Sequence, residues 1–245
     1  MFVKFCEARH NLAKDCLTIG LGTLQSYADD DPNFFRFDQR EGALKISTNG
    51  QAVHIDGQSF QALTGCVALN GARIEAGAGL TVKSQFPNCY IFCFSQDVFP
   101  TLNVARKIDA AYDDWYSITD LRKFIARTAE LLLGQLKVSD FENTDDVSLD
   151  WLGGLTLQVV HRPCSYDGRE LVLDQESIQQ AVNASEDMFR WPFSKELAHS
   201  EFQEYRILFV LRDAQGQIVP VKKNLKVLKL LPDLGVSTIE VTQGG

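Results

Sequence analysis

Residues 193–212 read FSKELAHSEFQEYRILFVLR, and this stretch decides the fold. After Lys195 the apolar residues have helical spacing. This pattern ends at Glu204, and residues 207–211 are apolar at every position. An unbroken apolar run predicts a strand that is buried on both faces of a sheet. Glu204 and Arg206 are two residues apart on this strand, so their side chains point to one face.

Further strands are predicted at residues 2–6, 89–94 and 155–161, and 89–94 should be central because it is apolar on both faces. Residues 17–27 are predicted to form a short strand or a helix end that turns at the two glycines. Asn49-Gly50, Asp56-Gly57 and Asn70-Gly71 predict hairpins within a β-rich meander over 43–88. Hairpin signals outnumber strand–helix–strand units. We therefore predict an α+β fold in one domain over 1–245, a mostly antiparallel, split sheet with helices packed on it.

Helical spacing predicts a helix over 117–135, with Ser117 and Asp120 as its capping pair, and helices over 173–183 and 186–199. After Tyr205 we expect a strand, a turn at 213–216, a partner strand over 218–231 and a last edge strand at 238–242. The lysines of the 218–231 segment should form the solvated face of an edge strand.

Composition excludes several classes of protein. The 245 residues are 45% hydrophobic, and the net charge is −8 with dispersed basic residues, so nucleic acid is not expected as a main partner. No run approaches the roughly 20 apolar residues of a membrane span, and the first 15 residues do not resemble a secretory signal. The six cysteines and four histidines lack metal-ligand spacing, so we expect free thiols, no metal and a cytoplasmic location.

Common nucleotide motifs are also missing. The chain contains no GxxxxGK[ST] loop, and Gly20-Leu-Gly22 begins like a dinucleotide fingerprint but has Gln25 where the third glycine is required. The remaining candidate is Glu204, a carboxylate at the mouth of a buried strand, where burial and neighbouring charges tune a pKa for catalysis. The structural alternative is a Lys195–Glu204–Arg206 ion-pair cluster that closes the end of the sheet.

The spacing of Lys195, Glu204, Arg206 and Ile207, with Cys93-Phe-Ser95 at the end of a central strand, resembles a family of uncharacterised bacterial and phage proteins. That family carries the C-terminal pattern Lys-x3-Trp-x2-Glu-x-Glu-x-Arg-Ile. It is similar to the ADP-ribosyltransferase-like superfamily, in which a split antiparallel sheet holds NAD in a cleft.

The resemblance implies an enzyme that consumes NAD in bacterial or phage conflict, with a protein as a plausible acceptor. Glu204 matches the catalytic position, where a carboxylate stabilises oxocarbenium character on the nicotinamide ribose. Arg206 would bind pyrophosphate or hold Glu204. Lys195, Ser95 and Tyr27 would bind the cofactor.

Two positions depart from the family pattern, because His199 replaces its Trp and Phe202 its first Glu. These departures and the acidic charge favour an alternative, a non-enzymatic protein-binding module such as an inhibitor, an immunity protein or an assembly subunit. Nucleotide or nucleic-acid processing without NAD is a third possibility.

Overall fold

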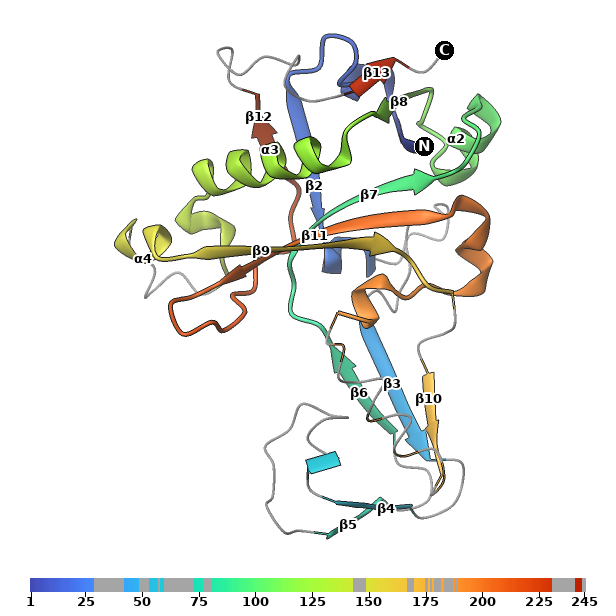
Figure 1. Cartoon of the computed structure of the whole chain (residues 1–245), viewed down its shortest axis with the longest axis vertical. Helices are drawn as coiled ribbons and strands as arrows, with labels where there is room; N and C mark the ends of the chain where they lie inside the picture. Colours follow the sequence, from blue (N-terminus) through green and yellow to red (C-terminus); the bar gives the residue numbers. More distant parts are fainter. Residues whose placement is uncertain are drawn as a thin grey trace. The chain divides into compact units, whose positions relative to one another are not determined.

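The chain folds into two units, shown in the computed structural model of Figure 1. The first comprises Met1–Gln39, Pro87–Cys164 and Ala198–Gly245, and the second comprises Arg40–Phe86 and Ser165–Leu197. The structure describes residues 1–28, 42–48, 53–56, 58–59, 73–76, 81–142, 149–166, 170–174, 176, 178, 182, 187, 189–230 and 241–243. Whether 1–245 forms one domain stays a prediction.

An antiparallel sheet of eight strands forms the first unit, so the predicted α+β class with a mostly antiparallel sheet is confirmed. Its main path runs β12-β2-β7-β1-β8-β13, and β11 lies on the other edge of β7 with β9 beyond it. The strands are β1 (Phe2–Cys6), β2 (Thr18–Thr23), β7 (Tyr90–Gln96), β8 (Asp114–Ile118), β9 (Thr156–Pro163), β11 (Glu204–Arg212), β12 (Lys226–Lys229) and β13 (Val241–Gln243).

The sheet splits beside β7. One edge of β7 pairs with β11 from Tyr90 to Ser95. The other edge is shared, because β2 pairs only with Tyr90 and Ile91 and β1 pairs only with Ser95 and Gln96. Within the described chain, β1 and β2 therefore diverge beside residues 92–94 and leave a gap in the sheet.

Helix α3 (Leu121–Gly134) covers one face of this sheet, where Phe124 and Leu131 pack with Phe92 and Ile207 in the main core. The predicted helix starts four residues later than expected. Residues 114–118 pair with β1 as strand β8, and Asp120 alone caps the helix by accepting a hydrogen bond from the Lys123 N–H at 3.0 Å.

Shorter helices connect these strands. They are α2 (Leu102–Ile108), α4 (Leu149–Gly153), η1 (Ala8–His10), η2 (Leu24–Ala28), η3 (Val138–Asp140), η4 (Trp191–Phe193) and η5 (Leu197–Phe202). Helical structure was predicted over 186–199 with a break at Pro192, and the described part of this segment instead contains the 3-10 helices η4 and η5. Most of the 173–183 segment lies outside the described residues.

The prediction of a partner strand over 218–231 was wrong, both in the extent of the strand and in the strand that it pairs with. Only an isolated bridge joins Ile218 to Arg212, and β12 then pairs with β2 instead of β11. Lys226 is buried, not solvated. Its Nζ donates to the Gln135 carbonyl oxygen at 2.7 Å and contacts the buried carboxylate of Asp140.

The second unit has a three-stranded sheet and a separate strand pair. β3 (Ala43–Thr48) lies between β6 (Thr81–Gln85) and β10 (Glu170–Leu173), antiparallel to the first and parallel to the second. β4 (Val53–Asp56) pairs with β5 (Arg73–Ala76), so the pairs are nested, whereas a simple meander would place β3 beside β4. The predicted Asn-Gly turns lie outside the described residues.

Among the described residues, no helix is long and apolar enough to cross a membrane.

Candidate functional site

Glu204 is the first residue of β11 and lies directly opposite Ser95 of β7. The backbone is constrained on both strands at this end of the sheet. Gln203, immediately before Glu204, has a φ of 41°, and Asp97, two residues after Ser95, has a φ of 55°. Residues other than glycine rarely adopt this left-handed conformation, and such residues cluster at functional sites.

Arg206 holds the Glu204 carboxylate. Its Nε donates to Glu204 Oε1 at 2.5 Å, and the Arg206 residue is only 1% exposed. This ion pair is the contact expected from the two-residue spacing. It is compatible with both interpretations, because the guanidinium either positions a catalytic carboxylate or forms a purely structural pair.

Tyr27 shares a face of the sheet with Glu204, Arg206 and Ser95. Ser95 and Ile91 are four residues apart on β7, so they point to the same face, and Gly22 lies opposite Ile91. The Tyr27 ring packs on this face of Gly22, because a Cβ added there would lie 2.6 Å from Tyr27 Cε2. The structure therefore places four of the five predicted site residues on one face of the first unit.

Lys195, the fifth predicted site residue, lies in the second unit. It is buried, and its backbone N–H donates to the Ser165 carbonyl oxygen at 2.9 Å. Its predicted pairing with Glu204 stays a prediction.

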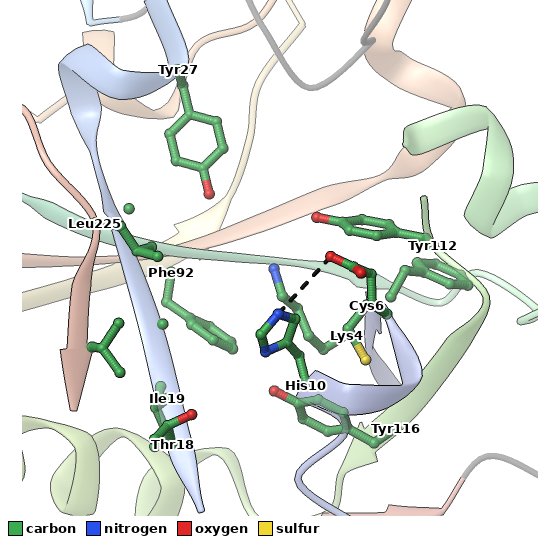
Figure 2. A pocket seen from close by; sticks show the side chains of 15 residues that line it. Lys4, Cys6, His10, Thr18, Ile19, Tyr27, Phe92, Tyr112, Tyr116 and Leu225 are labelled. Atoms are coloured by element: carbon green, nitrogen blue, oxygen red, sulfur yellow. Dashed lines mark ion pairs between the residues drawn. The ribbon is translucent and has the colours of Figure 1, made fainter. Parts of the chain in front are cut away.

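A pocket of about 320 Å³ opens at the split between β1 and β2. Figure 2 shows Tyr27 pointing into it from η2, opposite side chains from β1, η1 and β8. Glu204 does not line it. The lining residues are Lys4, Phe5, Cys6, Glu7, His10, Thr18, Ile19, Gly20, Gly22, Tyr27, Phe92, Tyr112, Tyr116, Leu225 and Val227.

The two ends of this pocket differ in chemistry. Tyr27, Leu225 and Val227 line it on the face that carries Glu204, and Leu225 and Val227 are exposed apolar side chains. The core end passes through the split toward the core, where it meets Lys4, Phe92 and Tyr116. The pocket therefore has an apolar, aromatic mouth and a core end with a cation and a phenol.

Lys4 compensates for the missing strand partner at the split. Its Nζ donates to the Cys93 carbonyl oxygen at 2.7 Å, a group that a paired strand would otherwise contact. The same ammonium lies 4.9 Å from the centre of the Phe92 ring. Because an ammonium has three donors, Lys4 can also bind a ligand in the pocket.

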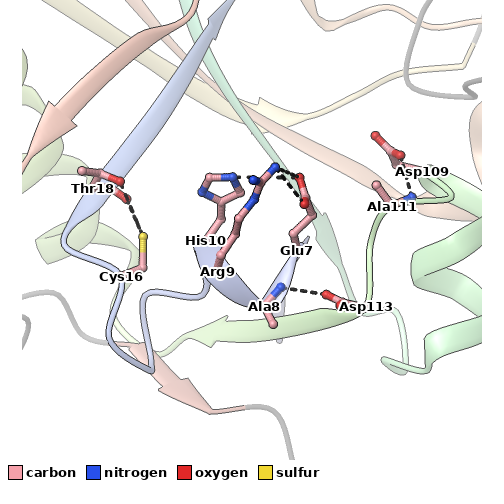
Figure 3. Close-up of polar contacts among 9 residues, drawn as sticks. All are labelled: Glu7, Ala8, Arg9, His10, Cys16, Thr18, Asp109, Ala111 and Asp113. Atoms are coloured by element: carbon pink, nitrogen blue, oxygen red, sulfur yellow. Dashed lines mark hydrogen bonds and ion pairs between the residues drawn. The ribbon is translucent and has the colours of Figure 1, made fainter.

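The rim beside Lys4 carries both signs of charge. Glu7 contacts Arg9 at 3.0 Å and the His10 Nε2 atom at 3.9 Å, as Figure 3 shows. Asp113 fixes the start of η1 by accepting a hydrogen bond from the Ala8 N–H at 2.7 Å. The Arg9 guanidinium thus offsets the Glu7 carboxylate beside the pocket.

Burial raises the pKa values of two groups at the core end. It raises the pKa of the Cys6 thiol to about 12, and it raises the pKa of the Tyr116 phenol well above its ordinary value. Both groups are therefore protonated and neutral at pH 7. Cys6 is not an activated nucleophile.

Sequence reasoning missed Lys4, Tyr116 and His10 as pocket residues. Lys4 reads as an ordinary member of the strand predicted over 2–6, and no strand was predicted at Tyr116, so only the pairing of β1 with β8 brings them together. No family model, curated protein or solved structure matches this chain.

Proposed function

We propose that the first unit binds NAD at the split of its sheet and cleaves the nicotinamide–ribose bond with the help of Glu204. One observation carries the proposal. The pocket at the split has Tyr27 at its mouth, on the same face of the sheet as Ser95, Glu204 and Arg206.

The chemistry of Glu204 fits this reaction. Loss of nicotinamide leaves positive oxocarbenium character on the ribose, and a fixed carboxylate stabilises that charge. The Arg206 contact at 2.5 Å holds the carboxylate at the start of β11, and Ser95 lies opposite Glu204 on the neighbouring strand. A preorganised charge needs little rearrangement during the reaction.

The size of the pocket is consistent with a site that encloses only part of NAD. Ligand pockets measure roughly 300–1,000 Å³, and this pocket is at the lower limit with about 320 Å³. It suits one nucleotide half of NAD, with the other half extending over the face that carries Ser95 and Glu204. The ammonium of Lys4 supplies positive charge for a phosphate.

Nicotinamide release from NAD tests the proposal. The wild type should release nicotinamide, and Glu204→Gln should reduce the rate at least about 100-fold, as removal of a key charge-stabilising group does. Glu201→Gln is the matched control, because Glu201 is exposed and contacts Lys107 at 3.1 Å. Absence of nicotinamide release from the wild type, with water or protein acceptors, would contradict the proposal.

A second candidate is a non-catalytic binding module, and the buried Arg206 favours it. In this case the ion pair with Glu204 serves only the fold. The same assay separates the two candidates. A module would bind its partner equally well after Glu204→Gln and would release no nicotinamide.

A further inference from the structure

Tyr116 carries a hydroxyl at the core end of the pocket. The residue lies on β8, is 2% exposed and lines the pocket. Figure 2 shows its side chain beside His10, among the residues that line the pocket. Among the residues that the structure describes, none forms a hydrogen bond with this hydroxyl.

Among the described residues, the Tyr116 hydroxyl oxygen is not enclosed by protein atoms, so water or a ligand can reach it within the pocket. Burial raises the pKa of Tyr116, so the hydroxyl keeps its proton at neutral pH and can donate it to an acceptor. The Tyr116 hydroxyl can therefore donate a hydrogen bond to a ligand that enters the pocket.

Tyr90 provides a comparison within the same sheet. Its hydroxyl, unlike that of Tyr116, is fully buried without a partner in the described part of the chain, and Tyr90 does not line this pocket. The two tyrosines differ in what their hydroxyls can reach. Tyr116 faces a space that a ligand can enter, whereas Tyr90 is enclosed by the core.

Lys4 is the direct cross-strand partner of Tyr116. Side chains of such a pair share a face, with Cβ atoms about 4.5–5.5 Å apart. Lys4 uses one donor on the Cys93 carbonyl oxygen, so the pair combines free ammonium donors with one neutral hydroxyl donor. Two adjacent donors and one positive charge suit an anionic oxygen group.

The other charged groups at the pocket do not reverse its preference for an anionic ligand. Glu7 is the one acidic side chain that lines it, and it contacts Arg9 and His10. Asp114 lies on the strand that carries Tyr116, but its carboxylate contacts Lys14 at 2.5 Å and Asn11 at 2.9 Å. Both carboxylates are thus offset by basic or amide groups.

We propose that the Tyr116 hydroxyl and the Lys4 ammonium bind a phosphate group of a nucleotide at the core end of the pocket. This inference rests on the proposed function and deepens it, because it orients the nucleotide with its phosphate at Lys4 and its ring toward Tyr27. The phosphate can come from NAD or from a free nucleoside monophosphate.

Calorimetric titrations with AMP, adenosine and NAD test the site in the full chain. Tyr116→Phe removes only the hydroxyl, so it should weaken AMP and NAD binding roughly tenfold and leave adenosine binding unchanged. The wild type should bind AMP more tightly than adenosine. Tyr90→Phe is the matched control and should leave all three affinities unchanged.

Thermal unfolding gives a second readout. Without ligand, Tyr116→Phe should melt at the wild-type temperature or above it, because no described residue forms a hydrogen bond with the hydroxyl that it removes. Tyr90→Phe should behave in the same way. A lower melting temperature for Tyr116→Phe would instead assign its hydroxyl to the fold and overturn the inference.

The outcomes separate this inference from the proposed function. AMP binding that depends on Tyr116, without NAD cleavage, supports the phosphate site and contradicts the NAD-cleaving role. NAD cleavage with AMP and NAD affinities that Tyr116→Phe does not alter overturns the phosphate site alone. Failure of the wild type to bind AMP at millimolar concentration also overturns it.

Discussion

The ring of Tyr27 lies on Gly22, close enough that a Cβ at position 22 would be 2.6 Å from Tyr27 Cε2 and 3.1 Å from its hydroxyl oxygen. A contact of 2.6 Å is too short for any side chain. The bare backbone of Gly22 therefore lets Tyr27 lie against β2 at the mouth of the pocket.

Gly22→Ala should displace the Tyr27 ring. We expect a loss of about 1–3 kcal/mol in the free energy of unfolding, the usual cost of overpacking, and weaker NAD binding. Gly20→Ala is the control for stability, because its Cβ would meet Leu225 at an ordinary 3.5 Å. Urea denaturation and calorimetry measure both effects, and an unchanged stability for Gly22→Ala would contradict the packing described for Tyr27.

Gln203→Gly should stabilise the protein. The φ of 41° at this position is strained for glutamine and relaxed for glycine, so the free energy of unfolding should rise by about 0.5–1 kcal/mol. Gln203→Ala keeps the strain and should give no gain. If the glycine variant is less stable than the alanine variant, strain at this position is not significant.

Removal of the Glu204 side chain should lower the stability of the fold and also reduce any activity. Glu204→Ala takes an acceptor from the buried Arg206 and should lower the free energy of unfolding by about 3 kcal/mol. Glu204→Gln keeps an acceptor oxygen and should cost about 1 kcal/mol. Equal stability of the alanine variant and the wild type would show that the ion pair contributes nothing to the fold.

Cys6 should resist alkylation although it lines the pocket. With a pKa of about 12, only roughly one thiol in ten thousand is ionised at pH 8, and the thiolate is the reactive form. Peptide mass spectrometry after iodoacetamide treatment should find Cys6 unmodified in the native protein and modified in urea. Rapid labelling of native Cys6 would mean that its pKa is near the ordinary value.

The central strands follow from local sequence, because their signals are unbroken apolar runs. The runs at 89–94 and 207–211 predicted two buried strands, and both are present as the paired strands β7 and β11. The contact of Glu204 with Arg206 also follows from a local rule, the two-residue alternation of a strand.

The pocket depends on pairings between distant segments, which local patterns do not encode. Lys4 and Tyr116 are 112 positions apart in the sequence, and their meeting depends on the register of β1 with β8. The environment of Lys226 likewise depends on distant segments and does not follow from local sequence. Alternation with apolar neighbours predicted a solvated lysine, whereas the distant Asp140 and Gln135 give its ammonium buried partners.

The crystal structure of Glu204→Gln with NAD tests the central claim most directly, because this variant should bind NAD without cleaving it. We predict NAD in the split between β1 and β2, a phosphate oxygen within hydrogen-bond distance of the Tyr116 hydroxyl, and the nicotinamide ribose beside residue 204. NAD bound outside the split, or a nicotinamide ribose remote from residue 204, would contradict the account.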